Sequence, residues 1–208
     1  SGQHGLQVIS WADVTHPERI GWLDPPGNAL AVTIATTADS TLAYVSDRYG
    51  ALHIVDVNQS KNPHQLASYD STGMTWSVAL AGDVAYVAAG EQGLHLVDVH
   101  ERVRPQKLGS FNPFDSFIRD VVVMDHYAYA SDHRHGRLFV LDVADPERPL
   151  LASIFETPGG AYAGTAVGNL IYLADGAAGL RIVDVSKPDS PFEVGSWQTP
   201  GVATDVVV

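Results

Sequence analysis

Residues 179–185 read GLRIVDV, and this stretch decides the fold because the chain repeats it. A run of apolar, mostly β-branched residues that ends in an aspartate is typical of a strand followed by a turn. Similar stretches read LHIVDV at 52–57, LHLVDV at 94–99 and LFVLDV at 138–143, with a more distant copy, LQVISW, at 6–11. Five copies indicate a repeat protein, so each residue has to be compared with its equivalents in the other units.

Three markers keep the same register along the chain. The aspartate that closes the motif is followed seven residues later by a proline, and a tyrosine marks a second short apolar strand. The aspartates are Asp56, Asp98, Asp142 and Asp184, with Ser10 in the first copy; the prolines are Pro17, Pro63, Pro105, Pro149 and Pro191; the tyrosines are Tyr44, Tyr86, Tyr129 and Tyr172. The repeat length is therefore about 42 residues.

Each unit is predicted to hold four short strands, which we call a, b, c and d. In the fourth complete unit they are expected at 160–167, 170–174, 180–185 and 192–197, separated by turns rich in glycine, asparagine, aspartate and proline. No stretch has the period of an amphipathic helix. The pattern predicts an all-β fold, a β-propeller of four-stranded antiparallel blades with about five blades covered.

The units predict one domain, 1–208, a propeller or a fragment of one. Their expected bounds are 1–23 (partial), 24–70, 71–111, 112–155, 156–197 and 198–208 (partial). In strand letters the chain reads c-d, four complete units, then a, which leaves one strand missing from a five-bladed ring. Because exposed strand edges are normally avoided, we expect part of a longer propeller, or completion of the open blade by another segment or chain.

The chain resembles the LVIVD-repeat β-propellers, a family with WD-repeat-like architecture. The resemblance rests on GLHLVDV, GLRIVDVSKPDSPFEVGSW, AYVAAG and IYLADG, and it spans essentially the whole chain. It implies the fold and, because family members are mostly surface or secreted proteins without an assigned reaction, an extracellular or cell-surface binding or scaffold role. The first unit departs from the pattern at Ser10 and Trp11.

Composition excludes several classes of function. The chain is 45% hydrophobic and 17% charged, which is typical of a globular protein, and no apolar run is long enough to cross a membrane. The net charge of −12 and the lack of basic clusters argue against nucleic acid and anionic membrane as partners. Cysteine is absent, so neither disulfides nor thiolate–metal sites are expected.

Repetition separates scaffold residues from candidate site residues. The aspartates that close the motif are predicted to cap turns, and the same role is expected of a second set that follows the tyrosine strand, Asp47, Asp132 and Asp175. A third set opens strand a, which lines the channel of a propeller, so Asp120 and Asp205 are expected to face the channel together. His53 and His95 share one position of strand c with glutamine, phenylalanine and arginine, which predicts a partly exposed position.

Unit lengths point to one face of one blade. The unit that contains 138–143 has two extra residues, one in the d–a connection FNPFDSFIRD and one in the b–c connection SDHRHG, and these connections emerge on the same face of a blade. Loops on a rigid scaffold are where binding residues concentrate. The candidate binding residues are Phe114, Asp115, Phe117, Arg119, Asp132, His133, Arg134 and His135, joined by Trp76 and Tyr162. Arg48, Tyr49, Glu91 and His4 are expected on the same face.

Two alternatives remain within this set. Asp132, His133 and His135 form a weak candidate metal site, against which stands a solvated polar loop. Trp76 is either a binding residue beside the channel or a packed residue at its rim.

No catalytic motif is present: the chain has no G-x-S-x-G, H-E-x-x-H or P-loop sequence and no cysteine nucleophile, and no cofactor is expected. We therefore predict a non-enzymatic binding or scaffold propeller that recognises a protein or glycan through one face. The alternatives are a propeller hydrolase or lyase that uses histidine, arginine and aspartate at that face, or a structural subunit of a larger surface assembly. A flat aromatic patch would favour binding, and a deep pocket with perturbed titration of Asp120, His133 and Asp205 would favour an enzyme.

Overall fold

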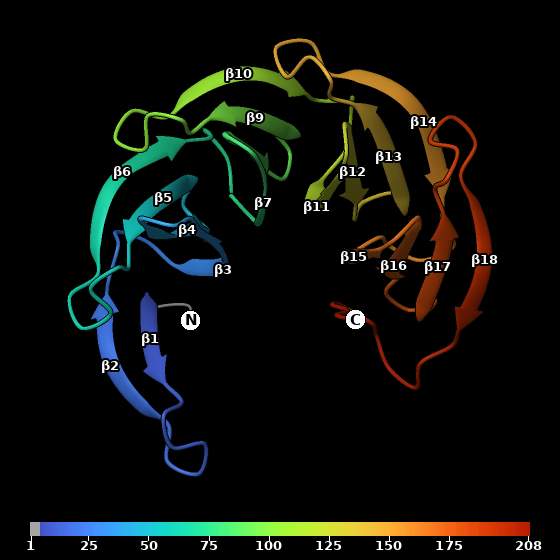
Figure 1. Cartoon of the computed structure of the whole chain (residues 1–208). Coiled ribbons are helices and arrows are strands. Elements are labelled where there is room, and N and C mark those ends of the chain that lie inside the picture. Colours follow the sequence, from blue (N-terminus) through green and yellow to red (C-terminus); the bar gives the residue numbers. More distant parts are fainter. Residues whose placement is uncertain (1–4) are drawn as a thin grey trace.

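The computed structural model describes residues 5–208, and every regular element in that range is a β-strand. The strands form one two-stranded and four four-stranded antiparallel sheets. Figure 1 shows these sheets arranged as the blades of an open arc, and we call the inner side of the arc, where the first strands lie, the channel side. The predicted all-β propeller architecture is therefore confirmed. The described part of the chain contains no helix that could cross a membrane.

Each sheet is one blade, and the blades are numbered in chain order. Blade 1 contains β1 (Leu6–Ser10) and β2 (Glu18–Leu23). Blade 2 contains β3 (Ala29–Thr36), β4 (Thr41–Asp47), β5 (Ala51–Asp56) and β6 (His64–Asp70). Blade 3 contains β7 (Ser77–Ala81), β8 (Val84–Ala88), β9 (Leu94–Asp98) and β10 (Gln106–Phe111). Blade 4 contains β11 (Ile118–Met124), β12 (Tyr127–Asp132), β13 (Arg137–Asp142) and β14 (Leu150–Glu156). Blade 5 contains β15 (Ala163–Val167), β16 (Leu170–Ala174), β17 (Leu180–Asp184) and β18 (Phe192–Trp197).

Strand order within a blade follows the chain, so strand a lies at the channel and strand d lies outermost (Figure 1). Of the strands expected in blade 5, only the first differs clearly, because β15 begins at Ala163 and not at residue 160. Each c–d pairing has one register shift, between Val140 and Leu141 in blade 4 for example. Such a bulge bends the outer strand, which suits a strand that curves around the rim.

The hydrophobic core lies between neighbouring blades, because successive side chains of a strand point to opposite sheet faces. In β13, Phe139 is buried against blade 3 together with Leu94, whereas Leu138 and Val140 are buried against blade 5 together with Ile171. The apolar run of strand c is therefore buried on both sides. This packing fixes the angle between blades and holds their loops in place.

Strand c contradicts one prediction. His53 and His95 are buried, with exposed fractions of 3% and 5%, and do not occupy a partly exposed position. Each has a polar partner that makes burial tolerable: His53 Nε2 lies 3.3 Å from Asp47 Oδ2, and His95 Nδ1 lies 3.0 Å from the Tyr69 hydroxyl. The equivalent Phe139 is also buried, whereas Gln7 and Arg181 are half-buried, so the prediction of partial exposure fails at the histidines and the phenylalanine.

Candidate functional site

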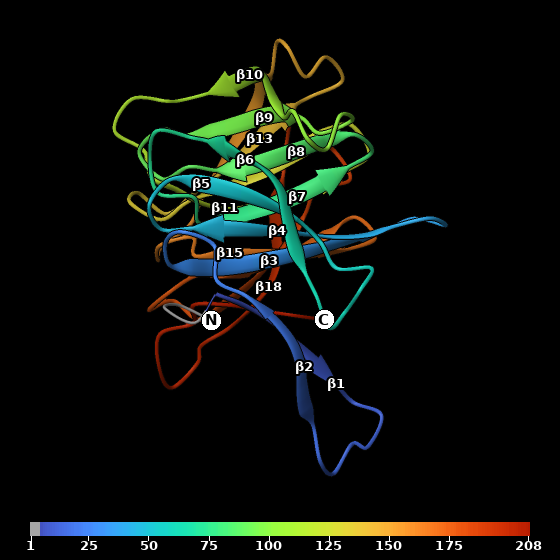
Figure 2. The same cartoon turned by 90° about the vertical axis from the view of Figure 1, so that its left-hand side faces the viewer.

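The b–c and d–a connections of blade 4 lie together at one end of the blade, as the register predicts. The Phe117 N–H donates to Asp132 Oδ1 at 2.8 Å, and the His133 N–H donates to the Phe117 carbonyl at 3.0 Å. We call this end of the propeller the loop face. The long β3–β4 turn of blade 2 projects from one side of the molecule in the edge-on view of Figure 2.

Buried aspartates connect the loops of this face. Asp132 is fully buried, and its Oδ1 also accepts the Arg134 N–H of its own b–c turn at 3.1 Å. Asp47 accepts the N–H groups of Asn28 and Tyr49 in the same way. Asp132 and Asp47 therefore cap their turns, as predicted, and tie them to the preceding d–a connection. The Asp175 side chain accepts from Gly159 of the preceding d–a connection and from no N–H of its own turn among the described residues. Asp132 differs from Asp47 in one respect, because its buried Oδ2 has no hydrogen-bond partner among the described residues.

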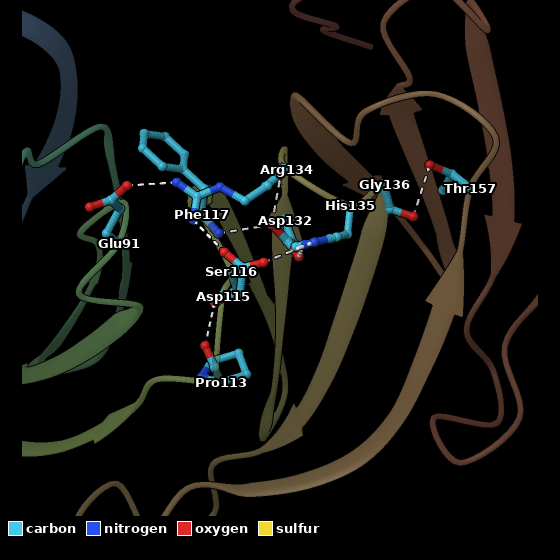
Figure 3. A network of polar contacts seen from close by, with 10 residues as sticks. All are labelled: Glu91, Pro113, Asp115, Ser116, Phe117, Asp132, Arg134, His135, Gly136 and Thr157. Carbon is cyan, nitrogen blue, oxygen red and sulfur yellow. Dashed lines mark hydrogen bonds and ion pairs between the residues drawn. The ribbon is translucent and has the colours of Figure 1, made fainter.

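A network of charges surrounds the outer part of blade 4. Arg134 donates to Glu91 of blade 3 at 2.6 Å and to Asp115 at 2.9 Å. The His135 ring lies 3.5 Å from Asp115 Oδ2 and 3.4 Å from Asp132 Oδ2. Figure 3 shows Arg134 and His135 reaching toward Asp115 from the b–c turn, with Glu91 on the neighbouring blade. We call these five residues the charged network. It fixes the conformation of both extended loops.

The backbone supports this arrangement at Asp115. Its φ of 55° lies in the left-handed region, which aspartate tolerates better than most residues. Beside it, Phe114 has an exposed fraction of 97% at the tip of the d–a connection. Phe114, Asp115, Glu91 and Arg134 line a surface cavity with a volume of about 450 Å³. The loop therefore presents an exposed phenyl ring next to fixed charges.

Aromatic rings from three blades meet nearer the channel. Phe117 makes edge contacts with Trp76, at a centroid distance of 5.6 Å, and with His133, at 6.3 Å. His133 in turn contacts Tyr162 of blade 5 at 4.1 Å. We call these four residues the aromatic cluster. Both descriptions offered for Trp76 hold in part, because its ring packs on Phe117 at the rim and the residue also lines the channel cavity.

Arg119 lies between the two ends of the aromatic cluster. Its guanidinium carbon is 5.3 Å from the Trp76 ring centroid and 4.6 Å from the Tyr162 ring centroid. Arg134 contacts the Phe117 ring in the same way at 5.8 Å. Cations over aromatic rings are attracted by the negative ring face. Burial and the positive charge of Arg119 both lower the pKa of His133, which favours a neutral imidazole.

The channel beside Arg119 holds a cavity with a volume of about 440 Å³. Asp120 and Asp205 both line it, as predicted for the acids that open strand a. Burial raises the pKa of Asp120, although hydrogen bonds from Ser77 and the Gly164 N–H partly oppose this shift. The Gly164 N–H donates to Asp120 Oδ2 at 2.8 Å. Because these donors belong to blades 3 and 5, Asp120 links three blades at the channel.

The structure brings nine of the ten predicted site residues into connected contacts. They divide between the charged network and the aromatic cluster with Arg119, and only Phe114 stands out into solvent.

The candidate metal site is not supported, because no group of three or more histidine, aspartate or glutamate residues within 5–208 is placed to hold a metal ion. The His133 ring packs against Tyr162, whereas His135 faces Asp115 and Asp132. Arg48 and Tyr49 lie on the b–c turn of blade 2, and His4 lies outside the described residues.

Two glycines contribute to the site without having been predicted. Gly90 and Gly176 occupy the repeat position that His133 fills in blade 4, and both have positive φ values. A Cβ atom on Gly176 would lie 2.8 Å from the Tyr162 ring, and one on Gly90 would lie 3.3 Å from Trp76 Nε1. These positions leave room for the aromatic cluster. An alignment of the units places Gly90 and Gly176 at the position of His133, and this difference is the sequence signal that could have identified the two glycines.

Comparisons with known proteins agree with this fold. The model of the LVIVD repeat matches residues 41–71, 72–112, 118–157 and 160–199. No curated protein sequence matches the chain. The β-propeller domain of Cps50 (Swd1) from Myceliophteria thermophila superimposes with a TM-score of 0.68 at 13% identity, over 96% of this chain and 68% of that one.

Two computationally designed proteins are also similar in structure. Ika8 has a TM-score of 0.69 at 10% identity, over 89% of this chain and 54% of that chain, so the chain spans about half of its length. Ika4 has a TM-score of 0.61 at 10% identity, over 79% of this chain and 96% of that one. Similarity at these identities describes the fold alone.

Proposed function

The chain belongs to the LVIVD-repeat family, and from this premise we propose that it is a non-enzymatic binding module that captures a partner protein through its loop face. One observation carries the proposal: the two connections that are longer in blade 4 than elsewhere are held rigid by buried and charged contacts and present Phe114 to solvent. Binding to such a face loses little conformational entropy, because the loops are already ordered. A role of this kind needs no cofactor.

The chemistry of the face favours a protein over a glycan. Sugar rings stack on free aromatic faces, but the faces of Trp76 and Tyr162 are already contacted by Arg119. Phe114 remains free, and it stands beside Arg134 and two carboxylates. An exposed aromatic anchor with arginine at its side is the usual composition of a protein-binding hot spot.

The proposal can be tested by site-directed photo-crosslinking in the source cells. A benzophenone amino acid at position 114 keeps an aromatic group at the loop tip and should become covalently linked to the partner. The matched control carries the same group at Asp39, in the exposed β3–β4 turn. We expect a specific adduct at position 114 and none at position 39, and Arg134→Ala should abolish it without lowering the melting temperature by more than a few degrees.

Several outcomes would reject the proposal. Equal adducts at both positions would show that the loop face is not selective. An adduct that is a carbohydrate chain and not a polypeptide would replace the protein partner with a glycan. An adduct that persists undiminished in Arg134→Ala would remove the charged network from the binding site.

An enzyme is the second candidate, favoured by the channel cavity and by the raised pKa of Asp120. The hydrogen bonds of Asp120 with Ser77 and with the Gly164 N–H give this carboxyl group a structural role that does not require catalysis. Screening the protein with hydrolase and lyase substrates separates the two candidates: a turnover that Asp120→Asn abolishes in a folded protein would favour the enzyme.

We also propose that the apolar side of β3 is covered by further strands, from another segment or another chain. Leu30, Val32 and Ile34 are exposed by 39%, 50% and 54% in succession along this strand, beside the two-stranded blade 1. In that case the protein is a structural subunit as well as a binding module. Sedimentation of the 208-residue chain should show association that Val32→Lys with Ile34→Lys removes; a monomer at all concentrations would count against a second copy as the cover.

For location we propose the cell surface or the extracellular space, which the family resemblance supports. Protease treatment of intact cells should degrade the protein, whereas a cytoplasmic marker should survive. Protection of both would contradict this location.

A further inference from the structure

Arg119 is held in place by its neighbours, but no acidic side chain among the described residues pairs with it. Two aromatic rings lie 4.6 and 5.3 Å from its guanidinium carbon, and within residues 5–208 its side chain makes no hydrogen bond or ion pair. Arg134 and Arg181 each contact two carboxylates. The five N–H donors of the Arg119 guanidinium therefore have no acceptor among residues 5–208, although the residue is partly buried and the chain carries twice as many acidic as basic residues.

A preordered guanidinium with free donors is suited to an anion. Its fork of N–H groups matches the two oxygens of a carboxylate, and the paired hydrogen bonds are charge-assisted. Because the rings of Trp76 and Tyr162 already restrict the side chain, binding costs little of the rotamer entropy that a free arginine would lose.

The surroundings limit which anion fits. The cavity of about 440 Å³ beside Arg119 is also lined by Asp120, Asp205 and Ser77. Two carboxylates in the same cavity oppose a second negative charge on the ligand, and the net charge of −12 repels polyanions at longer range. A single carboxylate is therefore favoured over phosphate or a sulfated chain.

We propose that Arg119 binds one carboxylate of the partner polypeptide, an acidic side chain or a C-terminal carboxylate, at the mouth of the channel. This inference rests on the proposed function and identifies the group that the loop face recognises. The aromatic cluster positions the Arg119 guanidinium. Phe114 and the neighbouring charged network provide the outer part of the contact with the partner.

The test uses the whole chain and small probes that isolate the carboxylate. Nuclear magnetic resonance follows the Arg119 Nε–Hε signal, assigned by its loss in Arg119→Lys, while sodium butyrate, uncharged butyramide or inorganic phosphate is added at constant ionic strength. Butyrate should shift the signal saturably, with half-saturation on the order of 10 mM. Butyramide should give no saturable shift, and phosphate should bind more weakly than butyrate.

Variants separate recognition from packing. Arg119→Lys keeps the charge but loses the fork, so butyrate binding followed on the Trp76 indole signal should weaken roughly tenfold, the effect of one charge-assisted hydrogen bond. Arg102→Lys is the matched control, because Arg102 is also partly buried but donates to Ser40 in blade 2, away from the cavity. It should leave butyrate binding unchanged.

Equal responses to butyrate and butyramide, or tighter binding of phosphate, would overturn the inference. The two proposals fail separately. If crosslinking at position 114 captures a polypeptide while butyrate leaves Arg119 unaffected, the binding face stands and the carboxylate role falls. If butyrate binds as expected but no adduct forms at position 114, the anion site stands and its link to a protein partner falls. Capture that is unchanged in Arg119→Lys would likewise place the carboxylate outside the partner contact.

Discussion

Asp98 and Asp132 are both repeat aspartates, but they differ in what they hold together. Asp98 is partly exposed and accepts the His100 N–H two residues later at 2.8 Å, so its role is confined to one turn. Asp132 is fully buried and accepts N–H groups from two connections. A buried carboxylate that loses several donors leaves them unsatisfied, which costs more than the loss of an exposed turn contact.

Alanine variants should separate these roles. Asp98→Ala is expected to lower the free energy of unfolding by about 1 kcal/mol, and Asp132→Ala by about 3 kcal/mol, because the second change leaves buried donors unpaired. Urea denaturation followed by circular dichroism measures both. A loss of crosslinking at position 114 in Asp98→Ala at unchanged stability would show that this turn belongs to the site.

Gly176 provides a second prediction at this scale. Alanine there is strained by the φ of 59° and also places its Cβ 2.8 Å from the Tyr162 ring. Gly168 has nearly the same φ, 58°, with nothing within 4 Å of its Cβ position. Gly168→Ala therefore measures the backbone cost alone, about 1 kcal/mol, and Gly176→Ala should cost about 1–3 kcal/mol more because the ring must move.

The measurement is the difference in unfolding free energy between these two variants, together with the Arg119 Nε–Hε signal. We expect this signal to move only in Gly176→Ala. Identical stabilities would mean that the Tyr162 ring adapts without cost and does not fix Arg119.

Among the elements, strand c shows how one position accepts very different side chains. In β5 the position holds His53 beside Asp47, and in β17 it holds Arg181 beside Asp175. In β13 it holds Phe139, and there the loop residue His135 takes the place beside the buried aspartate. The blade whose strand lacks a polar side chain at this position therefore gains a partner for its buried aspartate from the extended loop, which joins the charged network to the scaffold.

Burial of strand c predicts a pH dependence at β9. Burial lowers the pKa of His95 to about 4, from about 6.5 in an unfolded chain. The unfolded state therefore binds the proton more readily, so stability is complete above pH 6.5 and falls as the pH decreases toward 4. The full effect is about 3 kcal/mol.

His95→Gln should flatten this part of the stability profile, measured by urea denaturation between pH 4 and 7. His16→Gln is the control, because His16 lies on an exposed turn of blade 1. An identical acid profile in wild type and His95→Gln would show that His95 is protonated without opening its strand.

Across the whole molecule, polar contacts connect neighbouring blades in addition to the hydrophobic core. The Thr33 hydroxyl of blade 2 donates to the Val78 carbonyl of blade 3 at 2.7 Å, and Gly90 and Ile118 exchange backbone hydrogen bonds between blades 3 and 4. Asp120 continues the series toward blade 5 through the Gly164 N–H. Because repeat proteins are stabilised by contacts between neighbouring units, such links contribute to the cooperativity of the whole arc.

The stability of the protein should therefore depend on whether the residue at position 120 can accept a hydrogen bond more than on whether it carries a charge. Asp120→Asn retains an acceptor for the Gly164 N–H and removes a half-buried charge, so it should preserve most of the stability at neutral pH. Asp120→Ala leaves that donor unpaired and should cost about 2 kcal/mol. Thermal unfolding monitored by circular dichroism compares the three proteins. Equal losses in both variants would show that the carboxylate charge itself holds the blades together.

The sequence alone determined the repeat, the four strands of each unit and the blade that departs from the others. These features depend on local alternation, turn chemistry and spacing, which are properties of the chain itself. It also placed Phe117, Arg119, Arg134 and Tyr162 on one face, because the register fixes which connections emerge together.

Only the tertiary structure decided which of these side chains touch. Arg119 contacts two rings and Arg134 bridges to Glu91, and these contacts join residues from different blades. His53 is buried beside Asp47, which lies at the other end of the same turn. Such contacts depend on the angle at which neighbouring blades pack. That angle is set by the combined fit of the side chains between two sheets, and no single stretch of sequence contains it.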